Sequence, residues 1–184
     1  MKFLGISGSS KLDSLNSLLL HNAFELLNKE HQWEVVSVAN IPIFEQTDEE
    51  PDSVQKLRKK VNESDIVVIS TPEHNHSYSA SLKNAIDWLS IPLDKNPFRW
   101  KVVATMSAST GSLGGPRAQE HLWVVLKSLG AILVPGPEVF LVNADKKFIE
   151  GKLTDEVAKK FITELLNNSI ILANAIKCGL NQKS

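Results

Sequence analysis

Apolar residues follow two different periods along this chain. Short, nearly continuous apolar runs occupy positions 2–7, 33–38, 65–70, 100–106 and 132–141. Runs of this length, rich in β-branched residues, are typical of strands that are buried on both faces of a parallel sheet. Between and after these runs, apolar residues recur every three or four positions, which is the spacing of one face of a helix. Five strand–helix pairs in strict alternation predict an α/β fold, with a parallel sheet covered by helices on both faces.

Local signals predict where the helices begin and where one strand breaks. The first helix is expected to end near residue 28, and the other four to begin at Pro51, Ser79, Pro116 and Thr154. Proline suits a first turn because the N–H that it lacks has no partner there, and threonine is a favoured cap. Gly130 fits the position just after the fourth helix. The segment 135–137, Pro-Gly-Pro, interrupts the last apolar run, so the fifth strand is expected to be kinked or split.

The composition of the chain limits the kinds of molecule that it is expected to bind. The chain has 184 residues, of which 42% are apolar and 22% charged, and this suits a single domain over 1–184. The formal net charge of −1 creates no global field that attracts nucleic acid or an anionic membrane. The single cysteine, Cys178, precludes an internal disulfide and agrees with a reducing compartment. No signal-peptide core or membrane-spanning apolar run is visible. The sequence therefore predicts a cytoplasmic protein that binds neither nucleic acid nor membrane.

The loop after the first strand is rich in hydrogen-bond donors. Five of its nine residues carry side-chain donors, namely Ser9, Ser10, Lys11, Ser14 and Asn16. They precede a helix N-terminus, where free N–H groups and the positive end of the helix dipole favour a phosphate dianion. Ordinary helix capping is the alternative, but one cap needs only one such residue. The loop carries neither the P-loop pattern nor the dinucleotide fingerprint.

The loop after the third strand is also polar. The segment 72–75 offers a ligand its main-chain N–H groups, except at Pro72, and the Asn75 amide, although a plain polar turn explains the same residues. Glu73, His74 and His76 raise the possibility of a metal site. Residues two apart in an extended loop point to opposite sides, and no further His or Cys cluster completes a coordination shell. We therefore expect no metal.

The loop after the fourth strand, 107–115, is rich in Ser, Thr and Gly. Such a loop lets the main chain approach a flat ligand closely, but it is equally typical of a flexible surface turn. No G-x-S-x-G elbow is present, so a hydrolase triad has no support.

Taken together, the three loops resemble the NADPH-dependent FMN reductase family, which includes azoreductases, quinone reductases and chromate reductases. The first loop, GSSKLDSLN, is similar to the family pattern G-S-x-R-x-x-S-x-N. The second segment, PEHNHSYSASLKNAIDW, is similar to P-E-Y-N-x-S-x-P-G-x-L-K-N-A-x-D-W, and the third, SASTGSLGGPRAQEHL, to S-x-x-G-x-x-G-G-x-R-A-Q-x-x-L. The three segments occur in the family's order from the first strand into the fourth helix.

The resemblance implies a flavodoxin-like fold with strand order 2-1-3-4-5 and non-covalently bound FMN. By carry-over, the phosphate of FMN is held by the first loop and its ring by the other two, with no side-chain acid or base. The implied cofactor-binding residues are Ser9, Lys11, Ser14, Leu15, Asn16, Pro72, Glu73, His74, Asn75, Ser107, Ser109, Thr110 and Gly111. Lys11 replaces the family's Arg, His74 replaces Tyr, and Ser79-Ala80 replace Pro-Gly, so these four positions depart from the pattern.

The resemblance also implies the activity. NADPH or NADH gives a hydride to bound FMN and leaves, after which a quinone, an azo compound, a flavin or a similar small-molecule acceptor takes two electrons at the same site in a ping-pong sequence. Two alternatives remain open: a flavodoxin-type electron carrier, and a non-enzymatic flavin-binding redox sensor. Family members form homodimers or homotetramers. The third and fourth helices are the expected contact here, and Trp88 and Trp123 either mark that contact or widen the apolar stripes of their helices.

Overall fold

The parallel sheet forms the centre of the molecule. The computed structural model describes residues 1–46 and 49–181. Within them the strands run in the order β2 (Gln32–Ser37), β1 (Lys2–Ser7), β3 (Ile66–Ser70) and β6 (Val102–Ala108). On the far edge of β6, β7 (Ile132–Leu133) pairs with its first part and β8 (Val139–Leu141) with its last part. All of these pairs are parallel. The order confirms the predicted 2-1-3-4-5 arrangement, with a split fifth strand, and this arrangement is flavodoxin-like.

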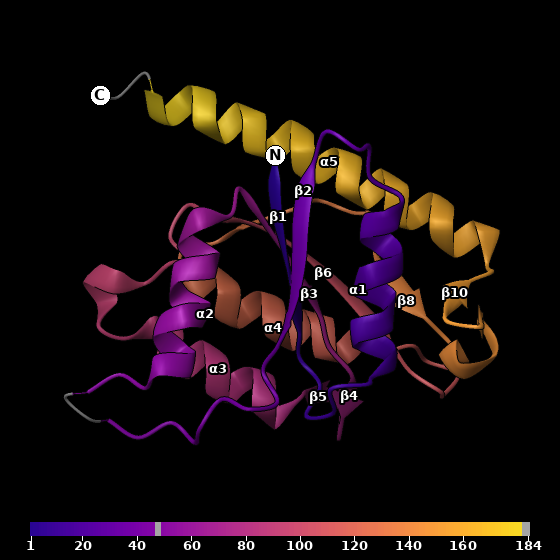
Figure 1. The fold of residues 1–184 in the computed structure, drawn as a ribbon, viewed down its shortest axis with the longest axis horizontal. Helices are drawn as coiled ribbons and strands as arrows, with labels where there is room; N and C mark the ends of the chain where they lie inside the picture. Colours follow the sequence, from indigo (N-terminus) through magenta and orange to yellow (C-terminus); the bar gives the residue numbers. More distant parts are fainter. Residues whose placement is uncertain (47–48, 182–184) are drawn as a thin grey trace.

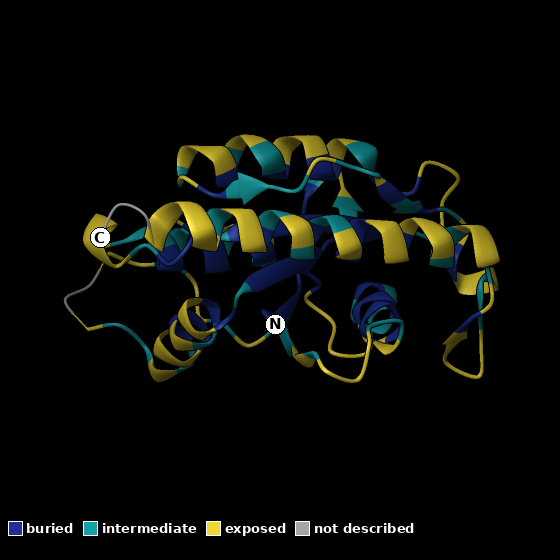
Figure 2. Cartoon of the chain, turned by 90° about the horizontal axis from the view of Figure 1, so that it is seen from above, coloured by how far each residue is buried: buried dark blue, intermediate teal, exposed yellow. Residues whose placement is uncertain are grey.

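Helices cover both faces of the sheet, as predicted (Figure 1). On one face lie α2 (Asp52–Glu63), α3 (Ala80–Ser90) and α4 (Pro116–Ser128), and their buried residues form one apolar cluster with β1, β3 and β6. On the other face, α1 (Leu15–Glu25) and α5 (Glu156–Asn181) form a second cluster with the same strands. Figure 2 shows that α5 lies on the surface, with exposed residues along its outer side. The molecule is thus a three-layer α/β/α sandwich.

A glycine in β1 allows α1 to pack closely against the sheet. A Cβ atom added to Gly5 would lie 2.8 Å from the ring of Phe24 and 3.3 Å from Leu20, both on α1. The close packing brings the N-terminus of α1 against the carboxyl ends of β1 and β3, where the first loop lies.

The helix ends agree with the sequence except at α1, which ends at Glu25 and not near residue 28, and at α5. Ser79 caps α3, because its hydroxyl accepts the Leu82 N–H at 3.1 Å. Pro116 is the first residue of α4, and Gly130 follows the C-terminus of α4 with φ 78°. At α5 the cap is Asp155, whose carboxylate accepts the Ala158 N–H at 3.0 Å. The expectation that Thr154 caps α5 is therefore wrong, since its hydroxyl instead donates to the Lys147 carbonyl.

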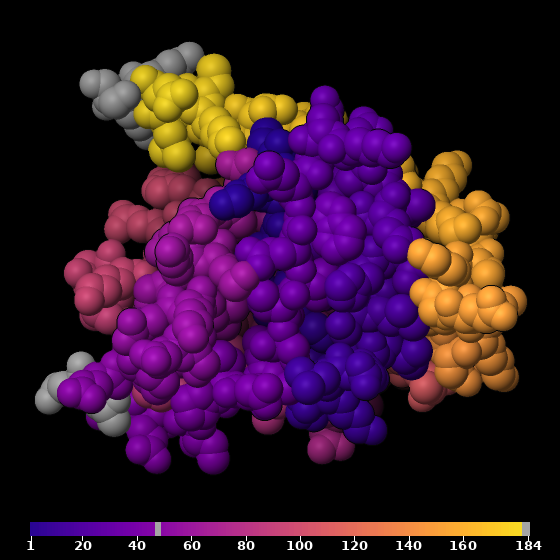
Figure 3. Space-filling model, viewed as in Figure 1, coloured from indigo at the N-terminus to yellow at the C-terminus, as the bar shows by residue number. Residues whose placement is uncertain are grey.

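Two small groups of elements are added to the sandwich. The segment after β3 forms a hairpin of β4 (Glu73–His74) and β5 (Ser77–Tyr78), whereas the sequence predicted an irregular loop. The excursion after β8 contains η2 (Ala144–Lys146), β9 (Phe148–Ile149) and β10 (Lys152–Leu153), and a further short helix, η1 (Leu93–Lys95), follows α3. In the space-filling view of Figure 3, the first third of the chain covers the visible face and this excursion projects at the right-hand side. No helix within 1–46 or 49–181 is long and apolar enough to cross a membrane.

Candidate functional site

The three polar loops meet at the carboxyl edge of the sheet, because they follow the neighbouring strands β1, β3 and β6. The Gly8 N–H donates to the Ser70 carbonyl at 2.8 Å, and the Thr71 N–H donates to the Met106 carbonyl at 3.1 Å. The Ser79 hydroxyl, at the start of α3, donates to the Gly8 carbonyl. Open α/β sheets bind ligands at this edge, beside the point where the strand order reverses.

Asn16 connects the first loop to the other two. Its amide oxygen accepts the Ser70 hydroxyl at 2.9 Å and the Ala108 N–H at 3.0 Å, and its amide nitrogen donates to the Ala108 carbonyl at 3.1 Å. Asn16 is only 3% exposed. Its side chain therefore serves the scaffold, and its main-chain N–H, in the first turn of α1, is the group that it can offer to a ligand.

The first loop keeps enough donors for a phosphate after the helix is capped. Ser14 is the cap of α1, because its hydroxyl oxygen accepts the Ser17 N–H at 3.0 Å, and the Ser9 hydroxyl oxygen accepts the Lys11 N–H at 3.1 Å. The Ser9 hydroxyl retains a proton to donate, and so does the Ser14 hydroxyl when Ser7, whose Oγ lies 3.3 Å away, donates to it. The Lys11 side chain is exposed, and the first N–H groups of α1 have no partner within the helix. This set of donors, which includes a cation, fits a phosphate dianion. A cavity of about 340 Å³ adjoins the loop, lined by Leu12, Asp13, Ser14, Leu15, Ser17, Leu18 and His21.

The Glu73 carboxylate, in the second loop, points to the N-terminus of α4. One of its carboxylate oxygens accepts the main-chain N–H of Arg117 at 3.1 Å and that of Ala118 at 3.4 Å, at the N-terminus of α4. His74 and Asn75 are exposed at the tip of the hairpin, and Pro72 is half-buried. The second loop can therefore meet a flat ligand with its main chain, Pro72, His74 and Asn75, but not with the Glu73 carboxylate.

The third loop divides into a buried and an exposed part. The Ser107 hydroxyl is fully buried and accepts a hydrogen bond from the Gln119 amide nitrogen at 2.8 Å. The Ser109 hydroxyl oxygen accepts the Gly111 N–H at 3.0 Å, and Thr110 and Gly111 are exposed. Of the residues expected at the cofactor in this loop, Ser109 and Thr110 thus present side chains to solvent, while Ser107 and Gly111 can contribute only through their main chains.

Sequence reasoning missed the role of Gln119, a fully buried residue of α4. Its amide oxygen accepts the Thr105 hydroxyl at 2.7 Å, and its nitrogen also donates to the Val139 carbonyl at 2.9 Å. Thr105 in turn accepts the Trp123 indole N–H at 2.7 Å. A buried amide must satisfy its polar atoms, and Gln119 does so by joining α4 to β6 and β8. The signal was present in the third segment, where the glutamine belongs to the quoted R-A-Q pattern.

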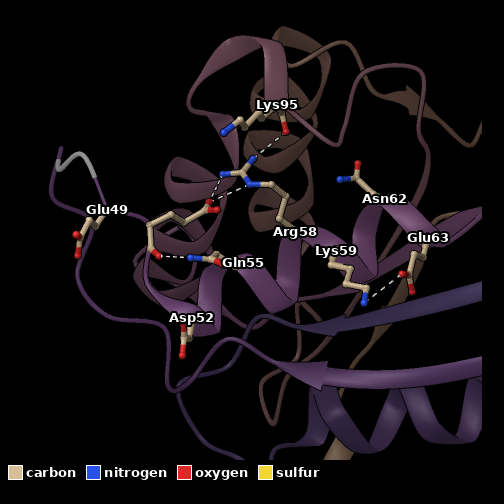
Figure 4. A pocket seen from close by; sticks show the side chains of 9 residues that line it. Glu49, Asp52, Gln55, Arg58, Lys59, Asn62, Glu63 and Lys95 are labelled. Atoms are coloured by element: carbon tan, nitrogen blue, oxygen red, sulfur yellow. Dashed lines mark hydrogen bonds and ion pairs between the residues drawn. The ribbon is translucent and has the colours of Figure 1, made fainter.

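A second hollow lies on α2 and shares no residue with the three loops. This charged groove of about 830 Å³ is lined by Glu49, Glu50, Asp52, Gln55, Arg58, Lys59, Asn62, Glu63 and Lys95 (Figure 4). The Arg58 guanidinium points from α2 toward Lys95 and is held by Glu50. Because Arg58 is buried and bonded within the chain, it is a structural bridge and offers no free donor to a ligand.

Comparison with known proteins decides the family. The profile of the NADPH-dependent FMN reductase family matches residues 1–146. The chain belongs to this family. It is 35% identical over 170 residues to an NAD(P)H-dependent FMN reductase of Pseudomonas aeruginosa, covering 90% of this chain and 91% of that one. It is 36% identical over 177 residues to an NAD(P)H:quinone oxidoreductase of Solanum tuberosum, covering 90% and 89%.

The solved structures agree with this assignment. FerB, a flavoenzyme NAD(P)H:(acceptor) oxidoreductase from Paracoccus denitrificans, superposes with a TM-score of 0.86 and 27% identity over 95% of this chain and 97% of that one. The predicted class is confirmed: this FMN reductase is an FMN-dependent NAD(P)H oxidoreductase, with FMN as its cofactor and a nicotinamide nucleotide as its reductant.

Tyr78 gives an optical test of the hairpin. It is the only tyrosine of the chain and is 9% exposed between the hairpin and its surroundings. Burial, and then the negative charge of Asp87, raise the pKa of Tyr78 to about 12. The folded state holds this proton more tightly than the unfolded state does. The contribution of Tyr78 to the free energy of unfolding is therefore complete below a pH of about 10, the pKa in the unfolded state, and is lost as the pH rises toward 12. We expect the phenolate absorbance of the native protein to appear near pH 12; a midpoint near the ordinary value shows that Tyr78 is not buried.

Proposed function

We propose that the enzyme holds FMN across the three loops at the carboxyl edge of the sheet. The hydroxyls of Ser9 and Ser14, the Lys11 ammonium and the first-turn N–H groups of Leu15 and Asn16 bind the phosphate. The ring lies between 72–75 and 107–111, which offer their main chains and the side chains of Pro72, His74, Asn75, Ser109 and Thr110. The observation that carries the proposal is the surplus of donors in the first loop, which remains after Ser14 has capped α1.

The chain positions the reactants and supplies electrostatics. FMN, when bound, supplies the hydride chemistry. The exposed parts of the second and third loops, 74–75 and 109–111, leave one side of the ring site open to solvent. We propose that NAD(P)H and a quinone or similar acceptor occupy this open side in turn, which gives ping-pong kinetics. Main-chain N–H groups of the two loops favour a negative charge at the ring edge beside them. No side-chain acid or base is needed.

Replacing Lys11 with alanine is expected to weaken FMN binding by about tenfold, because a cation beside a phosphate contributes about 1–2 kcal/mol at an exposed site. Lys11→Arg restores the cation and the binding. Lys29→Ala removes an exposed lysine of another loop and serves as the control. The dissociation constants are measured through the fluorescence of free FMN. Equal constants for wild type and Lys11→Ala would exclude Lys11 from the phosphate site.

We also propose that the chain assembles as a homodimer or homotetramer through α3 and α4. The support lies on α4, where Val124 is 69% exposed beside the half-buried Trp123. Trp88 does not contribute, because it is 4% exposed within its own chain, donates its indole N–H to the Pro42 carbonyl and packs edge-on against Phe44. For Trp88, the interpretation as a wider apolar stripe holds.

Light scattering tests the assembly. At micromolar concentration we expect a mass of at least twice the 20.3 kDa of one chain. Val124→Asp places a charge in the proposed contact and is expected to shift the mass toward that of one chain. A monomeric mass for the wild-type protein contradicts the proposal. The location in the cytoplasm and the organisation of 1–184 as a single domain stay predictions from the sequence.

A further inference from the structure

We propose that Glu73 is a positioning residue that fixes the opening between the second and third loops, where the flavin ring is proposed to bind. The inference rests on the proposed placement of FMN and adds to it a residue whose side chain does not touch the ring. Its basis is the way in which α4 begins.

The N-terminus of α4 has no cap of its own. The residue at the cap position is Gly115, with φ 98°, which has no side chain to accept a helix N–H. Any other residue would be strained there, because φ is positive and an added Cβ would lie 3.0 Å from both Cβ and Oγ of the buried Ser107. Pro116, the next residue, has no N–H. The first free donors of the helix are therefore the N–H groups of Arg117 and Ala118.

Glu73 satisfies both donors from another part of the chain. Its Oε2 atom accepts the Arg117 N–H at 3.1 Å and the Ala118 N–H at 3.4 Å. Its Oε1 atom lies 3.8 Å from the Arg117 guanidinium and 3.6 Å from the His76 ring. With a side chain only 13% exposed, Glu73 is fixed from two sides. A carboxylate at a helix N-terminus is also favoured by the helix dipole.

This cap joins two loops that are otherwise far apart in sequence. Glu73 belongs to the second loop, and 109–115, the rest of the third loop, leads directly into α4. The carboxylate therefore holds the second loop at a set distance from the end of the third. The Arg117 guanidinium reinforces the link, because it also hydrogen-bonds the His76 ring at 2.7 Å across the hairpin. Without the carboxylate, the hairpin and α4 keep only side-chain contacts, Arg117 to His76 at 2.7 Å and His121 to Ser77 at 3.2 Å, which leave the helix N-terminus uncapped.

Three substitutions separate the geometry of the cap from its charge. Glu73→Gln keeps an oxygen at the same reach and is expected to bind FMN within about twofold of wild type. Glu73→Asp keeps the charge but is shorter by one methylene, and Glu73→Ala removes the cap. We expect FMN affinity to fall about threefold in Glu73→Asp and about tenfold in Glu73→Ala. The redox potential of the bound flavin is expected to move in the same two variants and not in Glu73→Gln.

Asp155→Ala is the matched control. Asp155 caps α5, is partly buried and pairs with Lys147, so its loss has a similar structural cost at a helix remote from the three loops. We expect Asp155→Ala to lower the melting temperature as Glu73→Ala does while leaving FMN affinity and flavin potential unchanged. If the two alanine variants behave alike in all three measurements, Glu73 is a structural cap only and the inference is overturned.

The binding of riboflavin, which lacks the phosphate, shows whether the Glu73 substitutions act at the ring site or at the phosphate loop. If Glu73 acts on the ring site, Glu73→Ala and Glu73→Asp weaken riboflavin and FMN by the same factor. Weakening of FMN alone places the effect at the phosphate loop and overturns the inference. A wild-type protein that does not bind FMN contradicts the proposed cofactor site itself, so the two failures are distinguishable.

Discussion

Replacing Asn16 with alanine is expected to lower the free energy of unfolding by about 3 kcal/mol, because it leaves the Ser70 hydroxyl and the Ala108 N–H and carbonyl groups buried without a partner. The same change releases the first loop from β3 and β6, so FMN affinity is expected to fall by about tenfold or more. Urea unfolding of the apoprotein and FMN titration measure the two effects.

The control for this variant is a second buried asparagine in α1. Asn22 is 8% exposed and donates to the Leu18 and Gly151 carbonyls, both at 2.9 Å, and accepts the Leu153 N–H at 2.8 Å. Asn22→Ala therefore breaks as many hydrogen bonds at a distance from the loops. We expect it to destabilise the apoprotein comparably and to leave the FMN dissociation constant unchanged. Unaltered affinity in Asn16→Ala would show that the loops keep their relative positions without Asn16.

Replacing Arg58 with alanine is expected to cost about 3 kcal/mol of stability, because a buried guanidinium that satisfies several acceptors is lost. Arg58 is 6% exposed and donates from Nε to the Glu50 carboxylate at 2.9 Å. Its other donors meet main-chain carbonyls at and beyond the end of α3, namely those of Trp88, Leu89, Ile91 and Lys95. Arg58 thus joins α2 to the C-terminus of α3, where a cation is also favoured by the helix dipole.

Lys59→Ala is the control for Arg58, since Lys59 is the next residue of α2 and its ion pair with Glu63 is exposed, at 3.8 Å. Such a pair contributes about 0–0.5 kcal/mol. Arg58→Lys retains the charge without the planar fork, so its stability is expected to lie between those of wild type and Arg58→Ala. If Arg58→Ala and Lys59→Ala lower the free energy of unfolding in urea by the same amount, the structural role of Arg58 is contradicted.

The fold was predictable because its strands are buried on both faces. β3 is buried along its whole length, so it appears in the sequence as an unbroken apolar run. The hairpin after β3 was missed because its turn residues, Asn75 and His76, both have positive φ without any glycine. The cap of α5 was misplaced by one residue, since Thr154 and Asp155 are both favoured caps and only the position of the first helical turn distinguishes them.

The positions of the site loops were also predictable, but the directions of their side chains were not. Parallel strands end at one edge of the sheet, so the topology alone brings the three loops together. A polar side chain in such a loop can serve either a ligand or the protein, and the sequence does not show which. Asn16, Glu73 and Ser107 were all expected at the cofactor, yet their side chains hold α1, α4 and Gln119 in place. The binding roles of the individual residues stay predictions.

The visible absorption spectrum of the purified protein, recorded without oxygen before and after addition of NADPH, tests the central claim most directly. The flavin-loaded protein is expected to be yellow, and its flavin bands are expected to bleach on addition of NADPH and to return when a quinone is supplied. Bands that persist with both NADPH and NADH would contradict the assignment as a reductase and favour an electron carrier or a redox sensor. A protein that remains colourless when FMN is supplied would contradict the three-loop cofactor site itself.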